Sequence, residues 1–382
     1  MNHPTKPPHK VLRSQARSDT LRGPRQDHAE KLKIRLGTRR SRLARTQSQW
    51  VADLLAEQGH DVELVEVVTE GDVSTAPLAS MGGTGVFAAA IRHALAEHRV
   101  DLAVHSLKDL PVAPEPGLVV AAIPRRADAR DALVARDGLT LGELPPGSVV
   151  GTGSPRRAAQ LMALGLGLRV EAIRGNVETR LAQVHDGRLD AVVLARAGLD
   201  RLGLADQITE TLEPVQMLPA PGQGALALEV REDDEATRAA VAALEDADAR
   251  AAVTAERALL GALEAGCSAP IGALAEIAED VDGSLEISLR AFAGTVDGTF
   301  DLRRSTNGPA ARAAQLGADL AQVLLDDGAG DLIDQPDGQP PDPAPGDRPP
   351  TGRAEATRRT ETPTVTRDTS RHVPTSAAER EK

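Results

Sequence analysis

The chain has 382 residues and a formal net charge of -12, from 44 Lys+Arg against 56 Asp+Glu. This acidic balance disfavours a protein that coats nucleic acid, and aromatic residues at 1% are too few to stack bases. A single cysteine, Cys267, excludes an intramolecular disulfide and a multi-cysteine metal site. No apolar stretch reaches the ~18 residues of a membrane span.

The two ends of the chain differ in composition from the middle. Residues 1–31 are polar and basic and lack the apolar stretch of a secretory signal, and residues 334–382 contain nine prolines. Both compositions favour disorder, although a transit peptide stays open for the first segment. The folded body is expected over residues 32–333.

The first two-thirds of this body alternate β-branched runs with amphipathic patterns, which predicts an α/β fold with mainly parallel sheets. Strands are predicted at 34–37, 62–68, 102–105, 118–123, 149–151, 169–173 and 191–194. Helices are predicted at 42–57, 86–97, 156–164 and 177–186.

Two segments of the body resemble each other. Ile34–Ser41 and Val149–Arg157 both run from a strand through a Gly-Thr turn, a serine and arginines into a helix, and a glutamine follows in each helix. The repeat predicts two similar α/β lobes with a cleft between them.

The pattern changes after about residue 245. A helix is predicted at 249–264, strands at 270–276, 285–291 and 299–303, and a last helix at 310–325, which together indicate a small α+β domain. We therefore expect lobe 1 over 32–124 plus 219–245, lobe 2 over 125–218, and a third domain over 246–333.

Arginines gather where the predicted strands end, and ligands of open α/β sheets bind at carboxyl ends of strands. Ser154 is predicted as an N-cap and Pro155 as the first helical residue, which places Arg156 and Arg157 in the first turn. Because arginines there oppose the helix dipole, a bound anion would offset their cost.

Further arginines stand at comparable places. Arg39 and Ser41 take the equivalent position in the first lobe, and other strand-end arginines are Arg174, Arg180, Arg196 and Arg201. Each one alone is typical of a solvated surface, but the set favours a cleft for a small polycarboxylate.

Lys108 is the only lysine between Lys33 and Lys382, and it precedes Asp109 directly after a predicted strand. A lone Lys-Asp pair is usually a surface ion pair. At this strand end the carboxylate would instead stabilise a cationic intermediate or move a proton. His105 is equally typical of a core histidine.

Two other features have weaker signals. The loop Gly82–Gly85 lacks the spacing of a phosphate-binding fingerprint, so a mobile lid or a turn is expected. Cys267 follows Gly266, which is predicted to end a helix, and a helix carboxyl end does not lower a thiol pKa. Cys267 is therefore either an inert small core residue or a one-time attachment site for a strong electrophile.

At these residues the chain resembles the porphobilinogen deaminase (hydroxymethylbilane synthase) family. The ordered segments that carry the resemblance span nearly all of 32–333. They are Gly37–Ser41, Thr69–Asp72, Pro77–Phe87, Val104–Pro111, Gly151–Arg157, Arg174–Leu181, Ala197–Leu199, Pro219–Ala225 and Glu256–Gly272.

The resemblance implies two lobes like periplasmic binding proteins and a third domain whose Cys267 holds a dipyrromethane cofactor by a thioether. It implies a transferase of tetrapyrrole (haem) biosynthesis that condenses four porphobilinogen units into hydroxymethylbilane, with loss of ammonia. We expect a cytoplasmic monomer without a metal and without nucleic-acid or membrane partners.

The resemblance also assigns roles to residues. Asp109 is the acid that stabilises cationic pyrrole intermediates, and Lys108 is its catalytic neighbour. The expected cofactor-binding residues are Lys108, Ser106, Thr152, Ser154, Arg156, Arg157 and Arg180. The expected substrate-binding residues are Arg39, Ser41, Arg174, Arg180, Gln223 and Arg201.

The chain departs from the family pattern at a few positions. Ser80 and Thr84 replace lysines of many members, and Glu70 stands where a basic residue is common, so the lid contacts are in doubt. Ala265 and Ala269 flank the cysteine without changing its thiol. The competing hypothesis is a non-catalytic two-lobed receptor for a small polycarboxylate, which would need neither Cys267 nor Asp109.

Overall fold

The computed structural model describes residues 31–67, 85–264 and 269–333, which belong to one compact unit. Cys267, Ser80, Thr84, Glu70, and the tails expected to be disordered (apart from Lys31) lie outside the described residues. Among the helices of the described segments, none has the length and apolar character that a bilayer crossing needs.

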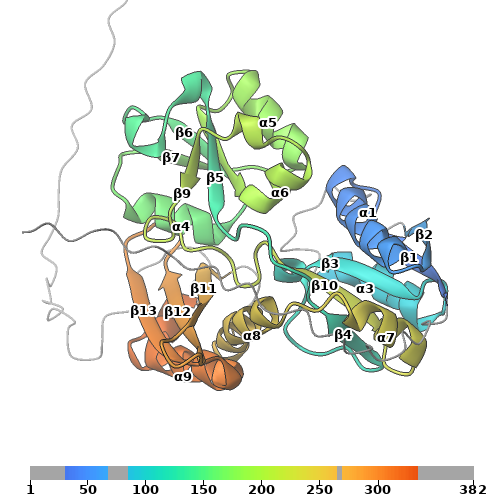
Figure 1. Cartoon of the computed structure of the whole chain (residues 1–382). Helices are drawn as coiled ribbons and strands as arrows, with labels where there is room; N and C mark the ends of the chain where they lie inside the picture. Colours follow the sequence, from blue (N-terminus) through green and yellow to red (C-terminus); the bar gives the residue numbers. More distant parts are fainter. Residues whose placement is uncertain (1–30, 68–84, 265–268, 334–382) are drawn as a thin grey trace, which may run out of the picture. The chain divides into compact units, whose positions relative to one another are not determined.

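Lobe 1 is built on a five-stranded sheet with the order β2-β1-β3-β10-β4 (Figure 1). Its elements are β1 (Lys33–Thr38), α1 (Arg42–Glu57), β2 (Asp61–Glu66), α3 (Gly85–Ala96), β3 (Leu102–Ser106), β4 (Leu118–Ala122), β10 (Leu226–Arg231) and α7 (Glu235–Ala242). Ile34 and Leu36, on one face of β1, share a buried cluster with Val51 and Leu55, one turn apart on α1. The buried face of the strand, which repeats every two residues, thus packs against the buried face of the helix, which repeats every 3.6 residues.

Lobe 2 has the same strand order, β7-β6-β8-β5-β9. Its elements are β5 (Asp131–Ala135), β6 (Val149–Thr152), α4 (Pro155–Ala163), β7 (Arg169–Ala172), α5 (Val177–His185), β8 (Ala191–Ala195), α6 (Arg196–Arg201) and β9 (Glu210–Leu212). The two similar strands β1 and β6 take the second position of their sheets and pair in parallel with both neighbours. The internal repeat and the α/β class are confirmed.

The expectation of mainly parallel sheets is wrong for half of the strand pairs in the lobes. β10 runs antiparallel to β3 and β4, and β5 runs antiparallel to β8 and β9. The sequence pattern predicts neither of these two strands. Each is the first strand after the chain passes from one sheet to the other.

The third domain is an antiparallel sheet, β11-β12-β13, with helices packed on it. Its elements are α8 (Ala247–Ala262), β11 (Ile271–Glu279), β12 (Leu285–Gly294), β13 (Asp301–Pro309), α9 (Ala313–Asp326) and α10 (Ala329–Ile333). Leu259, Leu289 and Leu320 join α8, β12 and α9 in one buried cluster. A Cβ atom on Gly317 would overlap the Ala255 carbonyl oxygen, so glycine permits the close approach of α9 to α8.

Short 3-10 turns complete the structure. They are Leu107–Asp109, Arg136–Gly138, Leu141–Glu143, Ala205–Gln207 and Ala310–Arg312. The membership of strands in three sheets supports the predicted domain limits of 32–124 plus 219–245, 125–218 and 246–333, and these limits stay a prediction.

Glu256 of α8 is 0% exposed and binds both connections between the lobes. Its carboxylate accepts hydrogen bonds from Arg126 Nη1 at 2.7 Å and Nη2 at 3.0 Å, and from Gly222 N at 2.6 Å. It also accepts one from Ala275 N of β11 at 2.8 Å. Arg126 lies between β4 and β5, and Gly222 between β9 and β10, so one buried carboxylate holds both connections against the third sheet.

Glu256→Gln should therefore destabilise the protein strongly. The change keeps the side-chain size but leaves the Arg126 guanidinium without its counter-ion, so we expect the free energy of unfolding to fall by about 3–5 kcal/mol. Urea denaturation, monitored by circular dichroism, measures this free energy of unfolding.

The matched control is Glu213→Gln. It breaks an ion pair with Arg130 in which the Glu213 side chain is 58% exposed, so its expected cost is below about 1 kcal/mol. Equal losses in the two variants would contradict the role given to Glu256.

Candidate active site

Lys108 and Asp109 lie together on the 3-10 turn Leu107–Asp109, directly after β3. Arg257 of α8 donates hydrogen bonds to the carbonyl oxygens of Leu110 at 2.9 Å and Pro111 at 2.6 Å. The turn that carries the predicted acid is thus held by a helix of the third domain.

His105 lies on β3 but belongs to the core. It is 7% exposed, and its Nε2 lies 3.1 Å from Glu229 Oε2, which also pairs with Arg92. The core alternative for this histidine is the one observed.

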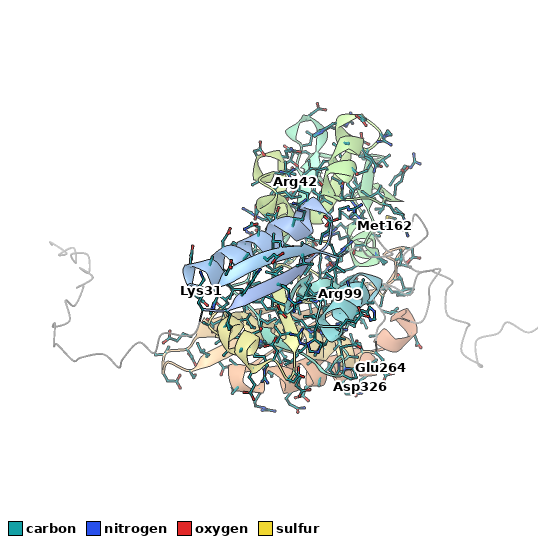
Figure 2. The ribbon with its side chains drawn as sticks, turned by 90° about the vertical axis from the view of Figure 1, so that its right-hand side faces the viewer. Lys31, Arg42, Arg99, Met162, Glu264 and Asp326 are labelled. Atoms are coloured by element: carbon teal, nitrogen blue, oxygen red, sulfur yellow. The ribbon has the colours of Figure 1, made fainter. Side chains whose placement is uncertain are left out.

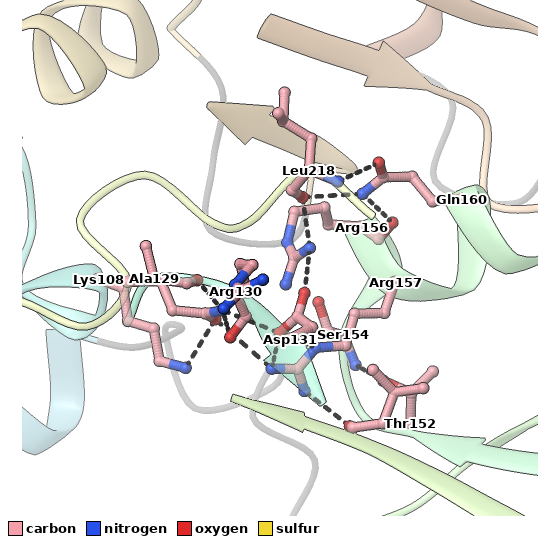
Figure 3. A network of polar contacts seen from close by, with 12 residues as sticks. Lys108, Ala129, Arg130, Asp131, Thr152, Ser154, Arg156, Arg157, Gln160 and Leu218 are labelled. Carbon is pink, nitrogen blue, oxygen red and sulfur yellow. Dashed lines mark hydrogen bonds and ion pairs between the residues drawn. The ribbon is translucent and has the colours of Figure 1, made fainter. Parts of the chain in front are cut away.

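Arg156 and Arg157 occupy the first turn of α4, and both are buried. Pro155 is at the start of the helix, and the Ser154 side chain makes no capping hydrogen bond. The two guanidinium groups converge, as predicted, but the anion between them is the Asp131 carboxylate of β5 (Figure 3). The expected offset of the helix dipole is therefore supplied from within the protein.

Gln223 connects this ion cluster to the Lys-Asp turn. Its Nε2 donates to Asp131 Oδ1 at 2.8 Å, and its Oε1 accepts from Lys108 Nζ at 3.3 Å. The residues proposed for both lobes thus share one network of hydrogen bonds.

Within the network, Asp131 and Lys108 differ in how their charge depends on pH. Burial would raise the pKa of Asp131, but the adjacent Arg156 and Arg157 outweigh it and hold this pKa well below its usual value. Burial lowers the pKa of Lys108 to about 8, and Asp109 and Asp131 oppose this shift while Arg157 and Arg156 add to it. Asp131 is therefore ionised throughout the neutral range, whereas Lys108 titrates near pH 8.

Arg180 of α5 extends the cationic cluster. Its Nε donates to Gly175 O at 2.9 Å, and a Cβ atom on Gly153 would lie 3.6 Å from its Nη2. Burial lowers the pKa of Arg180, the charges of Arg157 and Arg174 lower it further, and Asp109 opposes them. Asp109 of lobe 1 thus lies within electrostatic range of the arginines of lobe 2.

The other predicted site residues have local roles in the structure. Ser41 caps α1 by accepting from Ala44 N at 3.3 Å, and Ser106 Oγ accepts from Gln47 Nε2 at 3.1 Å. Thr152 Oγ1 accepts from Ser154 N at 3.2 Å. Arg39 follows β1 and is half-buried. None of these contacts tests a role in binding, so those roles stay predictions.

Two arginines after β8 are held by the protein itself. Arg201 Nη2 donates to Gly224 O at 2.7 Å, and burial lowers the Arg201 pKa to about 10. Arg196 Nη1 donates to Thr211 Oγ1 at 2.7 Å, and its Nε lies 3.5 Å from Asp128 Oδ2. Arg196 is thus held by an internal contact outside the network of Asp131.

A contact outside the network also joins the two lobes. Arg42 is at the start of α1 (Figure 2). Its Nη1 lies 3.3 Å from Glu178 Oε1 of α5, and its Nη2 donates to Leu202 O at 3.2 Å. Both side chains of this ion pair are exposed, so its contribution to stability is small.

Sequence reasoning missed Asp131, Arg126 and the anchoring role of Arg257. Asp131 precedes Ala132–Ala135, a short apolar run without the alternation that predicts a strand. Recognising that run as a buried strand would have placed an aspartate at the end of a sheet, beside the arginines of the next helix.

Comparison with known proteins identifies the family. Residues 34–239 match the family model "Porphobilinogen deaminase, dipyromethane cofactor binding domain", and residues 250–326 match "Porphobilinogen deaminase, C-terminal domain". The chain belongs to the porphobilinogen deaminase family. The porphobilinogen deaminase of Mycobacterium tuberculosis is 59% identical over 304 residues, covering 78% of this chain and 98% of that protein. The one of Mycobacterium avium is 58% identical over 304 residues, covering 78% and 96%.

Solved structures with two-lobed binding folds are also similar. The methionine-binding protein MetQ matches with a TM-score of 0.35 and 15% identity, over 55% of this chain and 89% of that chain. The L-cystine receptor of Neisseria gonorrhoeae matches with a TM-score of 0.31 and 14% identity, over 57% and 86%. The strand order of the lobes, rather than these matches, establishes the fold class.

The residues present fit the dipyrromethane cofactor of the family. Each of its pyrrole rings carries two carboxylates, so it needs several cationic partners. Among the described residues, the charges that act on one another here are those of Lys108, Arg156, Arg157, Arg174 and Arg180, together with the carboxylates of Asp109 and Asp131. Arg156 Nε is buried and has no hydrogen-bond partner among the described residues. In the same part of the chain, no group of three or more His, Cys, Asp or Glu side chains is arranged to hold a metal.

The Lys108 pKa predicts how substrate binding depends on pH. The ammonium is present below pH 8 and is lost as the pH rises through 8, so its attraction for a carboxylate is lost in the same interval. From pH 7 to 9 the protonated fraction falls about tenfold, so we expect the KM for porphobilinogen to rise, by at most about tenfold because the arginines keep their charge.

Lys108→Arg is the control, because an arginine keeps its charge over this range. Its KM should change much less between pH 7 and 9, measured from initial rates of porphobilinogen consumption. A wild-type KM that is constant over this range would contradict the titration of Lys108 at the site.

Proposed function

We propose that this chain catalyses the hydroxymethylbilane synthase reaction, the condensation of four porphobilinogen units into a linear tetrapyrrole with release of ammonia. One observation carries the proposal. The Lys-Asp turn of lobe 1 meets a cluster of buried arginines of lobe 2, in a chain 59% identical to a porphobilinogen deaminase over 98% of that enzyme.

The arginine cluster is proposed to bind the acetate and propionate groups of the pyrroles. Guanidinium groups form two parallel hydrogen bonds with a carboxylate, and partial burial strengthens such bonds. Arg180 is half-buried and Arg174 is exposed, so both are within reach of a ligand, and Arg39 follows the corresponding strand of lobe 1. Ser41, Ser106, Thr152, Ser154, Gln223 and Arg201 complete the proposed binding set.

Asp109 is proposed as the catalytic residue. As ammonia leaves porphobilinogen, positive charge develops on the pyrrole, and an adjacent carboxylate stabilises it. The same carboxylate oxygen accepts the proton that the ring loses after the new carbon–carbon bond has formed. Lys108 beside it binds a substrate carboxylate and keeps the local charge balanced.

Cys267 is proposed to hold the cofactor by a thioether. When bound, dipyrromethane supplies the covalently attached pyrrole end to which substrate units are joined. Support comes from α8, which ends five residues before Cys267 and whose Arg257 holds the turn of Asp109. The helix that leads to the cysteine is thus anchored at the proposed acid.

The finer properties are also proposals. We infer a cytoplasmic monomer that needs no nucleic-acid or membrane partner, in keeping with its acidic net charge of -12. A non-catalytic receptor for a polycarboxylate is not favoured, because it leaves Asp109 and Cys267 without a role.

Asp109→Asn tests the catalytic assignment. The amide keeps the size of the side chain but neither stabilises positive charge nor accepts a proton, so we expect kcat to fall by about 100- to 10,000-fold. The KM for porphobilinogen should change far less, because the arginines remain. Ammonia release under saturating porphobilinogen gives kcat.

The control is Asp137→Asn, in an exposed aspartate with a φ of 59° that asparagine tolerates. Its kcat should equal that of the wild type. If Asp109→Asn retained more than about a tenth of kcat, Asp109 would not be the acid.

A further inference from the structure

Asp131 is a fully buried carboxylate, and ligand binding by the arginine cluster does not explain its presence. It is the first residue of β5 and 0% exposed. Its Oδ2 accepts from Arg156 Nη1 at 2.8 Å, and its Oδ1 accepts from Arg157 Nε at 3.0 Å and Nη2 at 2.8 Å. The two guanidinium groups are therefore placed by one internal anion.

The same carboxylate sets the direction of the Gln223 amide. An ionised carboxylate only accepts hydrogen bonds, so the amide must present its Nε2 to Asp131, at 2.8 Å. Nε2 also donates to Ala129 O at 2.8 Å. The carbonyl Oε1 then accepts from Lys108 Nζ, at 3.3 Å.

We propose that Asp131 is the positioning residue of the site. Its carboxylate fixes Arg156 and Arg157 in lobe 2 and, through the Gln223 amide, the Lys108 ammonium of lobe 1 beside Asp109. This proposal rests on the proposed function, since the residues that Asp131 positions are the ones proposed to bind and to act.

The arginines need an internal anion because bringing cations together in a buried site costs free energy. Arg156 and Arg157 repel each other, oppose the dipole of α4, and lose most of their hydration on burial. Asp131 offsets these costs before any ligand arrives, so the donors keep one arrangement through successive additions. Because groups of this kind are already oriented, no free energy is needed to reorganise them as the transition state forms.

The test combines a titration with kinetics. The protein is labelled with ¹³C at lysine Cε, and the Lys108 signal is identified by its absence from Lys108→Arg. Among the described residues, the charged groups that act on Lys108 are Asp109, Asp131, Arg156 and Arg157. Asp131→Asn should move the Lys108 midpoint below its wild-type value, and kcat should fall about 100-fold, as for a misplacement of ~1 Å.

The matched control is Asp101→Asn. Asp101 also pairs with two arginines, Arg35 at 2.6 Å and Arg231 at 3.1 Å, but it is not among the charged groups that shift Lys108. It should leave both the Lys108 midpoint and kcat unchanged. An unchanged Lys108 midpoint in folded Asp131→Asn, or an equal loss of kcat in Asp101→Asn, would overturn the proposal.

A second variant covers the case in which Asp131→Asn does not fold. Asp131→Asn combined with Arg157→Gln removes one charge of each sign and keeps hydrogen-bonding groups. Because Asp131 and Arg157 act on Lys108 in opposite directions, its midpoint should return close to the wild-type value, while kcat stays at least about tenfold low. Full kcat in this double variant would overturn the positioning role.

The test separates this proposal from the proposed function. If the wild-type protein released no ammonia from porphobilinogen, the proposed function would fail. The Lys108 midpoints would still decide whether Asp131 controls the network, because they require no turnover.

Discussion

The buried ion cluster of Asp131, Arg156 and Arg157 is the interaction on which the candidate site depends. Two arginines in the first turn of α4 would not stay buried next to each other without an anion. Asp131 provides that anion from the first residue of a strand that enters its sheet from the other lobe. The antiparallel strand β5 thus has a chemical consequence, since it brings the carboxylate to the ends of the parallel strands.

A second buried carboxylate, Glu256, holds the two chain segments that connect the lobes. It binds Arg126 and the backbone of Gly222, and the next residue on α8, Arg257, holds the turn of Lys108 and Asp109. Gln223, adjacent to Gly222, links this region to Asp131. The third domain therefore supports the site through two neighbouring residues on α8, although its own sheet supplies none of the proposed binding groups.

The sequence predicted the elements with a clear period and the residues with a clear chemical signature. The repeated strand–turn–helix segments, the helix α8 and the three strands after it are confirmed, because their patterns arise from burial of one face. β5 and β10 escaped because both faces of a central strand are buried, which removes the alternation. The arginines at the start of α4 converge as the sequence predicts, but the Asp131 carboxylate between them comes from a distant part of the chain, which no local pattern contains.

The most direct measurement is the intact mass of the denatured protein, beside that of Cys267→Ser. A thioether survives denaturation, so the wild-type protein should carry an extra mass of two porphobilinogen units, each less one ammonia, and the variant should carry none. Further increments of one such unit should appear after brief mixing with porphobilinogen. A wild-type mass that stays unmodified after incubation with porphobilinogen would contradict covalent assembly of the tetrapyrrole on this chain.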